Sequence, residues 1–158
     1  MTKFLEAVRW VAPGVGLYLA LWLGQDAMEQ FSWLCGFTVA PIAGLTALES
    51  LFWGQRAAGE SGYGAGGRGY QRQSAFNNLA MALTCLPVYL LHWGVYAQAA
   101  LTTVFLTFFG LSALNHLYSA VRERNFTFRN LARPVLSAAL LALVLPFLWA
   151  ALVQAAGS

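Results

Sequence analysis

The sequence predicts an all-α integral membrane protein, a bundle of five transmembrane helices with its amino end in the cytoplasm and its carboxyl end outside. Three observations predict this class: the composition, the spacing of long apolar runs, and the one-sided placement of the basic residues. Hydrophobic residues make up 59% of the chain and charged residues only 9%, whereas soluble domains carry about 25% charged residues. An ordinary soluble protein is therefore excluded, and we expect the 158 residues to form a single transmembrane domain.

Five apolar runs come close to the length of about 20 residues that a helix needs to cross a bilayer. They are Val8–Gly24, Phe31–Trp53, Phe76–Trp93, Ala97–Tyr118 and Val135–Val153. Two longer connectors lie between them, at residues 54–75 and 119–134. Because no small-residue cleavage site precedes the polar turn after the first run, we expect that run to be a membrane helix rather than a signal peptide.

The basic residues orient the bundle, since Lys and Arg in short loops are retained on the cytoplasmic side of a membrane. They are Lys3, Arg9, Arg56, Arg68, Arg72, Arg122, Arg124, Arg129 and Arg133. All nine lie before or at the very start of the first run or in the two connectors, and the other turns and the carboxyl tail contain no Lys or Arg. Five spans satisfy this rule without exception. The arginines flank membrane segments and form no dense run, so nucleic acid is not an expected partner. The expected location is a cell membrane, most simply a bacterial inner membrane.

Small residues recur every four positions in the first two spans and predict close helix packing, because lipid offers no hydrophobic reward for association. The first span carries Ala12, Gly16, Ala20 and Gly24, and the second carries Gly36, Ala40 and Gly44. The short turn between these spans predicts that the two stripes meet in a tight antiparallel hairpin. The alternative is that one stripe faces a partner subunit.

Polar residues from three distant segments are predicted to meet at the cytoplasmic level. Glu49 lies one helical turn, about 6 Å, before the end of the second span; Asn77 and Asn78 open the third, and Asn115 and His116 close the fourth. Carboxylates inside spans are costly and face the bundle interior or water. These five residues form the candidate polar pocket. The alternative is a purely structural role, in which they form interhelical hydrogen bonds of about 0.6 kcal/mol each.

Other chemistry has little support in the sequence. Residues 62–69 fit G-x-G-x-x-G, but membrane helices flank them and no acidic residue follows about 20 positions later, so the segment is predicted to be a connector rather than a nucleotide site. A metal site needs at least three suitable ligands, and only two histidines are present. Cys35 and Cys85 are single thiols without C-x-x-C spacing, which indicates small apolar packing residues. No catalytic residue, metal or cofactor can be named from motifs.

The start of the third span carries part of a known motif. Ala75 and Asn78 fit R-A-x-x-N-x-x-E, while Ser74 and Met81 stand at its two charged positions. In this motif, and in the topology of spans two to five, the chain is similar to the membrane-associated eicosanoid and glutathione metabolism family. The resemblance implies a membrane enzyme or a lipophile-binding protein with a cytoplasm-facing polar pocket, and the loss of both charged residues argues against thiol conjugation.

Three functions from different classes fit these features. The favoured one is a non-catalytic accessory or assembly subunit of a larger membrane complex, with other membrane subunits or further copies of itself as partners in the lipid bilayer. The first alternative is the membrane enzyme or lipophile-binding protein implied by the resemblance. The second alternative is a small transporter. The sequence gives this alternative little support, because it has one acid inside the spans and no visible inverted repeat.

Overall fold

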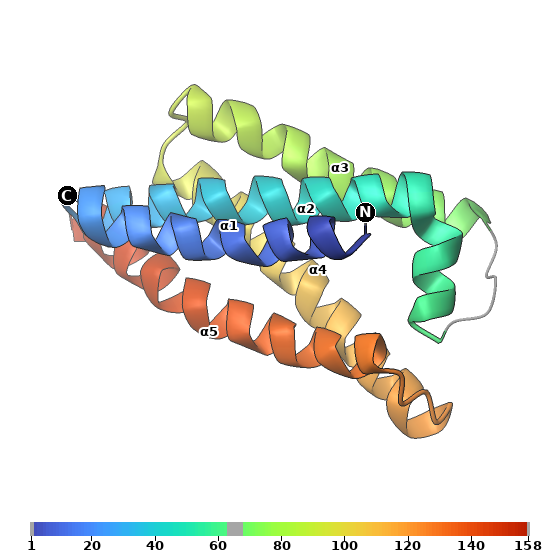
Figure 1. Cartoon of the computed structure of the whole chain (residues 1–158). Helices are drawn as coiled ribbons and strands as arrows, with labels where there is room; N and C mark the ends of the chain where they lie inside the picture. The colour runs from blue at the N-terminus through green and yellow to red at the C-terminus, as the bar shows by residue number, and fades with distance from the viewer. Residues whose placement is uncertain (1, 63–67, 158) are drawn as a thin grey trace.

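Five α-helices build the protein in the computed structural model, which describes residues 2–62 and 68–157 (Figure 1). They are α1 (Thr2–Leu23), α2 (Ala27–Glu60), α3 (Arg68–Leu90), α4 (Val95–Arg122) and α5 (Phe128–Gly157). The all-α prediction is confirmed. Four of the helices described, α1, α2, α4 and α5, are long and apolar enough to cross a membrane, as expected of a multi-pass membrane protein. Helix α3 differs because Gln71, Gln73, Asn77 and Asn78 occupy its first turns.

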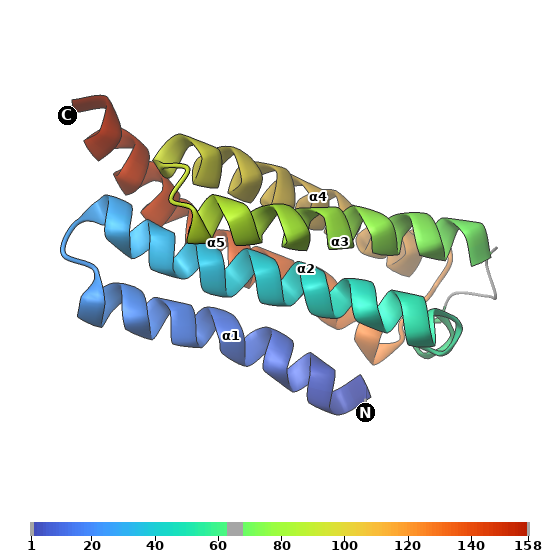
Figure 2. The same ribbon diagram turned by 90° about the horizontal axis from the view of Figure 1, so that it is seen from above.

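Successive helices run in opposite directions, and α2 lies between α1 and α3 (Figures 1 and 2). Helix α2 packs against all four other helices, and α4 and α5 pack against each other on its remaining side. The fully buried core sits where these helices meet, and its largest apolar members are Phe31, Phe105, Leu34, Ile42, Val39 and Val144. The amino end of the chain, the α2–α3 loop and the α4–α5 loop lie at one end of the bundle (Figure 1). We call it the arginine-rich end, because all nine Lys and Arg positions belong to its segments.

Helix α2 bends sharply at Trp53, whose backbone angles of φ −130° and ψ 16° are not helical. The next residue, Gly54, is a poor helix former, which fits a bend at this position. After the bend, residues 54–60 turn across the arginine-rich end (Figure 1). The bend coincides with the predicted end of the second span, although helical structure continues into the predicted connector. Similarly, α3 and α5 begin inside the predicted connectors 54–75 and 119–134.

The two small-residue stripes do not pack against each other, which corrects the predicted hairpin contact. Helices α1 and α2 are antiparallel neighbours, and a Cβ atom on Gly16 would lie 2.7 Å from the Cβ of Phe37 in α2. On α2, however, a Cβ on Gly36 would meet the ring of Tyr89, and one on Gly44 would meet Ala82. Both of those residues belong to α3. The α2 stripe therefore faces α3, because α1 packs on a neighbouring side of α2.

Candidate functional site

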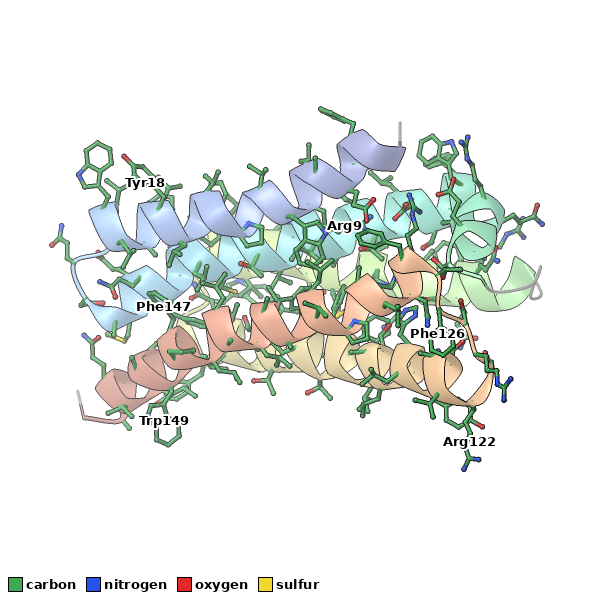
Figure 3. The ribbon with its side chains drawn as sticks, turned by 60° about the horizontal axis from the view of Figure 1, so that its bottom comes forward. Arg9, Tyr18, Arg122, Phe126, Phe147 and Trp149 are labelled. Carbon is green, nitrogen blue, oxygen red and sulfur yellow. The ribbon has the colours of Figure 1, made fainter. Side chains whose placement is uncertain are left out.

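Glu49 is the buried acid around which the candidate site is built. It lies on α2 about one turn before the bend, and only 5% of its surface is exposed. The Nη2 of Arg9 in α1 donates a hydrogen bond of 2.7 Å to its Oε2. Arg9 is itself 7% exposed and reaches into the space between α1 and α5 (Figure 3). This charged hydrogen bond joins the first two helices inside the bundle.

Arg129, in the first turn of α5, connects the same acid to two others. Its guanidinium lies 3.8 Å from Oε1 of Glu49, 2.8 Å from Oε2 of Glu60 and 3.6 Å from Oε2 of Glu6. Glu60 also pairs with Arg56 at 3.0 Å. These six residues form an arginine–glutamate network that links α1, both segments of α2 and α5. Glu49 and Arg9 are thus compensated, as buried charges must be if the fold is to tolerate them.

A cavity of about 50 Å³ lies beside this network. We call it the Arg133 cavity, because the half-buried Arg133 lines it. Helices α1, α2, α4 and α5 all contribute to its wall, with polar lining from Glu6, Arg9, Thr46, Glu49, Arg129, Arg133, Ser112 and Ser137. Among the residues described, the ion pairs use Arg9, Arg56 and Arg129, and Arg133 takes part in none of them. Three arginines and two glutamates line the cavity, so its formal charge is +1.

His116 lies on the other side of Arg133, in a separate hollow. Its Nδ1 is 2.7 Å from Oδ1 of Asn130, whose Nδ2 donates to the backbone oxygens of His116 and Asn125 at 3.1 and 2.8 Å. A second cavity, of about 150 Å³, is lined by His116, Arg133, Ser61 and residues of α2 and α3. Arg133 therefore forms part of the wall of both cavities.

The five predicted pocket residues are placed differently by the structure. Glu49 lines the Arg133 cavity and His116 lines the second one, with Arg133 common to both. Asn78 is 1% exposed and donates to the backbone oxygen of Ser74 at 2.9 Å. Asn77 and Asn115 are exposed and line neither cavity. Adjacent helical residues point about 100° apart, so when Asn78 and His116 face inward their neighbours in sequence face out.

Three residues of the site, Arg9, Arg129 and Arg133, were interpreted from the sequence only as markers of orientation. One signal for Arg9 was present. It is surrounded by apolar residues and lies three positions after Glu6, so both side chains occupy one face of the helix. Nothing in the sequence indicated that this face would meet Glu49.

The two loops at the arginine-rich end contact each other through Asn125. Its Nδ2 donates to the backbone oxygen of Ser61 at 2.9 Å and to Oγ of Ser119 at 3.3 Å. Gly62 follows with φ +76°, and a Cβ there would collide with the Asn125 side chain. Gly64, Gly66 and Gly67, on which the G-x-G-x-x-G matches depend, lie outside the described residues. The described part of this loop is thus fastened to the α4–α5 loop.

No metal centre emerges from the described part of the chain. No three His, Cys, Asp or Glu side chains come together there in a group that could hold a metal ion. Cys35 and Cys85 are buried. The sulfur of Cys35 lies 3.0 Å from Oγ1 of Thr102, so it bonds between α2 and α4 inside the core.

The comparisons with known proteins identify a family without an assigned activity. The family model described as a family of unknown function (DUF6790) matches residues 5–157. The chain belongs to this family. No curated protein and no solved structure matches it.

Proposed function

We propose that this protein is a five-span, non-catalytic accessory or assembly subunit of a larger membrane complex, with its arginine-rich end in the cytoplasm. One observation carries the proposal: the acidic and basic groups enclosed by the bundle bind each other across helices. The cavity beside them, at about 50 Å³, is far smaller than the roughly 300–1,000 Å³ of typical small-molecule sites. A network of this kind fixes helix positions, and the cavity beside it is too small to enclose a whole organic substrate.

The outer surface supports a role in association. A groove of about 470 Å³ runs between α4 and α5, and its lining is almost entirely apolar: Thr103, Leu106, Thr107, Gly110, Leu111, Leu114, Leu141, Leu145 and Leu148. Nothing lies within 4 Å of a Cβ built on Gly110. Small residues let two membrane helices approach closely, so a groove opened by a glycine suits a helix of another subunit.

Gentle detergent extraction of the tagged protein from its native membrane, followed by native electrophoresis, tests the accessory role. Other polypeptides should migrate with it. Gly110→Leu should remove them without lowering the melting temperature, because the new side chain fills only the outer groove. Gly14→Leu is the matched control, since a Cβ on Gly14 also meets nothing within 4 Å, and it should leave the complex intact. A protein that migrates alone, or only with further copies of itself, would contradict the proposal.

The proposed topology has its own test, because the native cysteines are buried and leave a silent background for labelling. Phe126→Cys, in the exposed α4–α5 loop, should react with a membrane-impermeant maleimide only after the cytoplasmic face is opened. Gln25→Cys, in the exposed α1–α2 turn, should react in intact cells. The opposite pattern, or labelling of both residues from one side, would refute five spans with a cytoplasmic amino end.

A further inference from the structure

Two buried hydrogen-bond donors at the Arg133 cavity have no acceptor among the residues described, and a third basic side chain there forms no ion pair. The Nε of Arg9 and Oγ1 of Thr46 are buried and without a partner among the residues described. The guanidinium of Arg133 forms no ion pair within the described part of the chain. Buried polar groups in native structures are nearly always satisfied, and each exception calls for an explanation such as a bound ion or water.

The two unsatisfied donors belong to α1 and α2, Arg133 belongs to α5, and all three residues border one cavity. The formal charge of the lining is +1, because two glutamates oppose three arginines. Both glutamates are already paired: Glu49 accepts a hydrogen bond from Arg9, and Glu6 and Glu49 each form an ion pair with Arg129. The group that completes this cavity must therefore carry negative charge and accept hydrogen bonds from several directions.

We propose that the Arg133 cavity binds a phosphate group. A phosphate offers tetrahedrally arranged oxygens, which suit donors from three helices better than the two coplanar oxygens of a carboxylate. Arginine is the favoured residue for phosphate because its planar guanidinium donates two parallel hydrogen bonds. In this site Arg133 of α5 supplies the guanidinium not used by the network, and Arg9 of α1 and Thr46 of α2 supply the two buried donors.

The position of the cavity gives a membrane lipid access to it. Trp10 of α1 and Leu136 of α5 line it alongside the charged groups, and α1 packs closely on α2 rather than on α5. Arg133 lies five residues after the start of α5, about 8 Å along the helix, which is compatible with headgroup depth. The phosphate is thus either part of a lipid headgroup or free in solution. This site is independent of the proposed accessory role.

Binding to the purified full-length protein in detergent micelles tests the proposal. The probes are phosphatidic acid, diacylglycerol with the same chains, and inorganic phosphate against chloride at equal ionic strength. Native mass spectrometry reports lipid retention, and melting temperature reports stabilisation. Phosphatidic acid should bind at least about tenfold more tightly than diacylglycerol, and Arg133→Gln should remove about tenfold in affinity, as expected for the loss of a charge-assisted hydrogen bond. Arg122→Gln is the matched control, because Arg122 points away from the bundle at the same end (Figure 3).

Each outcome decides between the sources or overturns the site. A preference for phosphatidic acid that depends on Arg133 supports a lipid headgroup, and an equal Arg133-dependent stabilisation by inorganic phosphate supports a free anion. Equal losses in the Arg122 and Arg133 variants, or no preference for phosphate over the controls, would overturn the proposal. If Arg133→Gln does not fold, Thr46→Val removes one donor at constant shape and should weaken phosphate binding about threefold. Unchanged binding in that variant would also refute the site.

Discussion

The two ends of the bundle are held together by different kinds of contact. At the arginine-rich end, charged side chains of α1, α2 and α5 bind one another, with Arg9 and Glu49 buried among them. At the opposite end the contacts between helices are neutral. Gln154 accepts from the backbone N–H of Met28 at 3.2 Å, and Gln98 donates to Ser32 at 3.1 Å.

The difference predicts where the helix arrangement is most sensitive to substitution. Removing one partner of a buried ion pair leaves an uncompensated charge and costs about 3–5 kcal/mol. A neutral hydrogen bond between membrane helices contributes about 0.6 kcal/mol. The arginine-rich end should therefore determine how α1 and α5 sit against α2, while the opposite end contributes small increments.

The largest effect is expected from Glu49→Gln. This change leaves Arg9 buried without its counter-charge and takes one carboxylate away from Arg129, so the free energy of unfolding should fall by about 3 kcal/mol. Glu29→Gln is the control at the opposite end, where the exposed acid accepts a hydrogen bond from the N–H of Gln25, and it should cost less than about 1 kcal/mol. Melting temperatures of the two variants in the same detergent provide the measurement. Equal losses would show that the two ends do not differ.

The middle of α1 offers an uncharged contact with α2, which can be compared with the charged contact between Arg9 and Glu49. Gly16→Leu places a side chain against Phe37 and should cost about 1–3 kcal/mol through overpacking. Gly14→Leu, two residues away on the open face, should be close to neutral. Thermal unfolding of both variants checks this, and a neutral Gly16 variant would contradict a close contact between α1 and α2 at this position.

The smallest effect is expected from Gln154→Leu. The substitution removes the acceptor for the N–H of Met28 in the first turn of α2, and a loss of about 0.6 kcal/mol should follow. We expect the melting temperature of this variant to be nearly equal to that of the unmodified protein. A loss as large as that of Glu49→Gln would contradict the assignment of the opposite end to weak contacts.

The all-α class and the four long apolar helices followed from the sequence, because such helices are encoded locally, in the length and composition of single segments. The limits were set by features that depend on tertiary neighbours. The only sign of the bend at Trp53 in the sequence is the glycine that follows it. Residues 54–60 are helical although their composition is polar. The small-residue stripe of Gly36 and Gly44 was visible in the sequence. Its partner is α3 rather than α1, and this choice depends on how the other helices surround α2.

The site was predictable only in part for the same reason. Glu49 stood out, because an acid inside an apolar run must find a partner, and the structure places it inward. Its partner Arg9 lies 40 residues away in sequence. The positive charge of Arg9 had already been attributed to the retention of basic residues on the cytoplasmic side, so it did not suggest a buried ion pair. Asn77 and Asn115 entered the predicted pocket by adjacency in sequence, and helical rotation turns them outward.

A double-mutant cycle on Arg9 and Glu49 tests most directly whether this buried pair holds α1 in place. Arg9→Leu and Glu49→Leu should each destabilise the protein, because Glu49→Leu leaves Arg9 buried without its counter-charge and Arg9→Leu leaves Glu49 with only the longer contact of 3.8 Å to Arg129. The double variant should lose about 2 kcal/mol less than the sum of the two single losses, which is the coupling energy of the pair. Strictly additive losses would show that Arg9 and Glu49 act independently and would contradict a charged connection between α1 and α2.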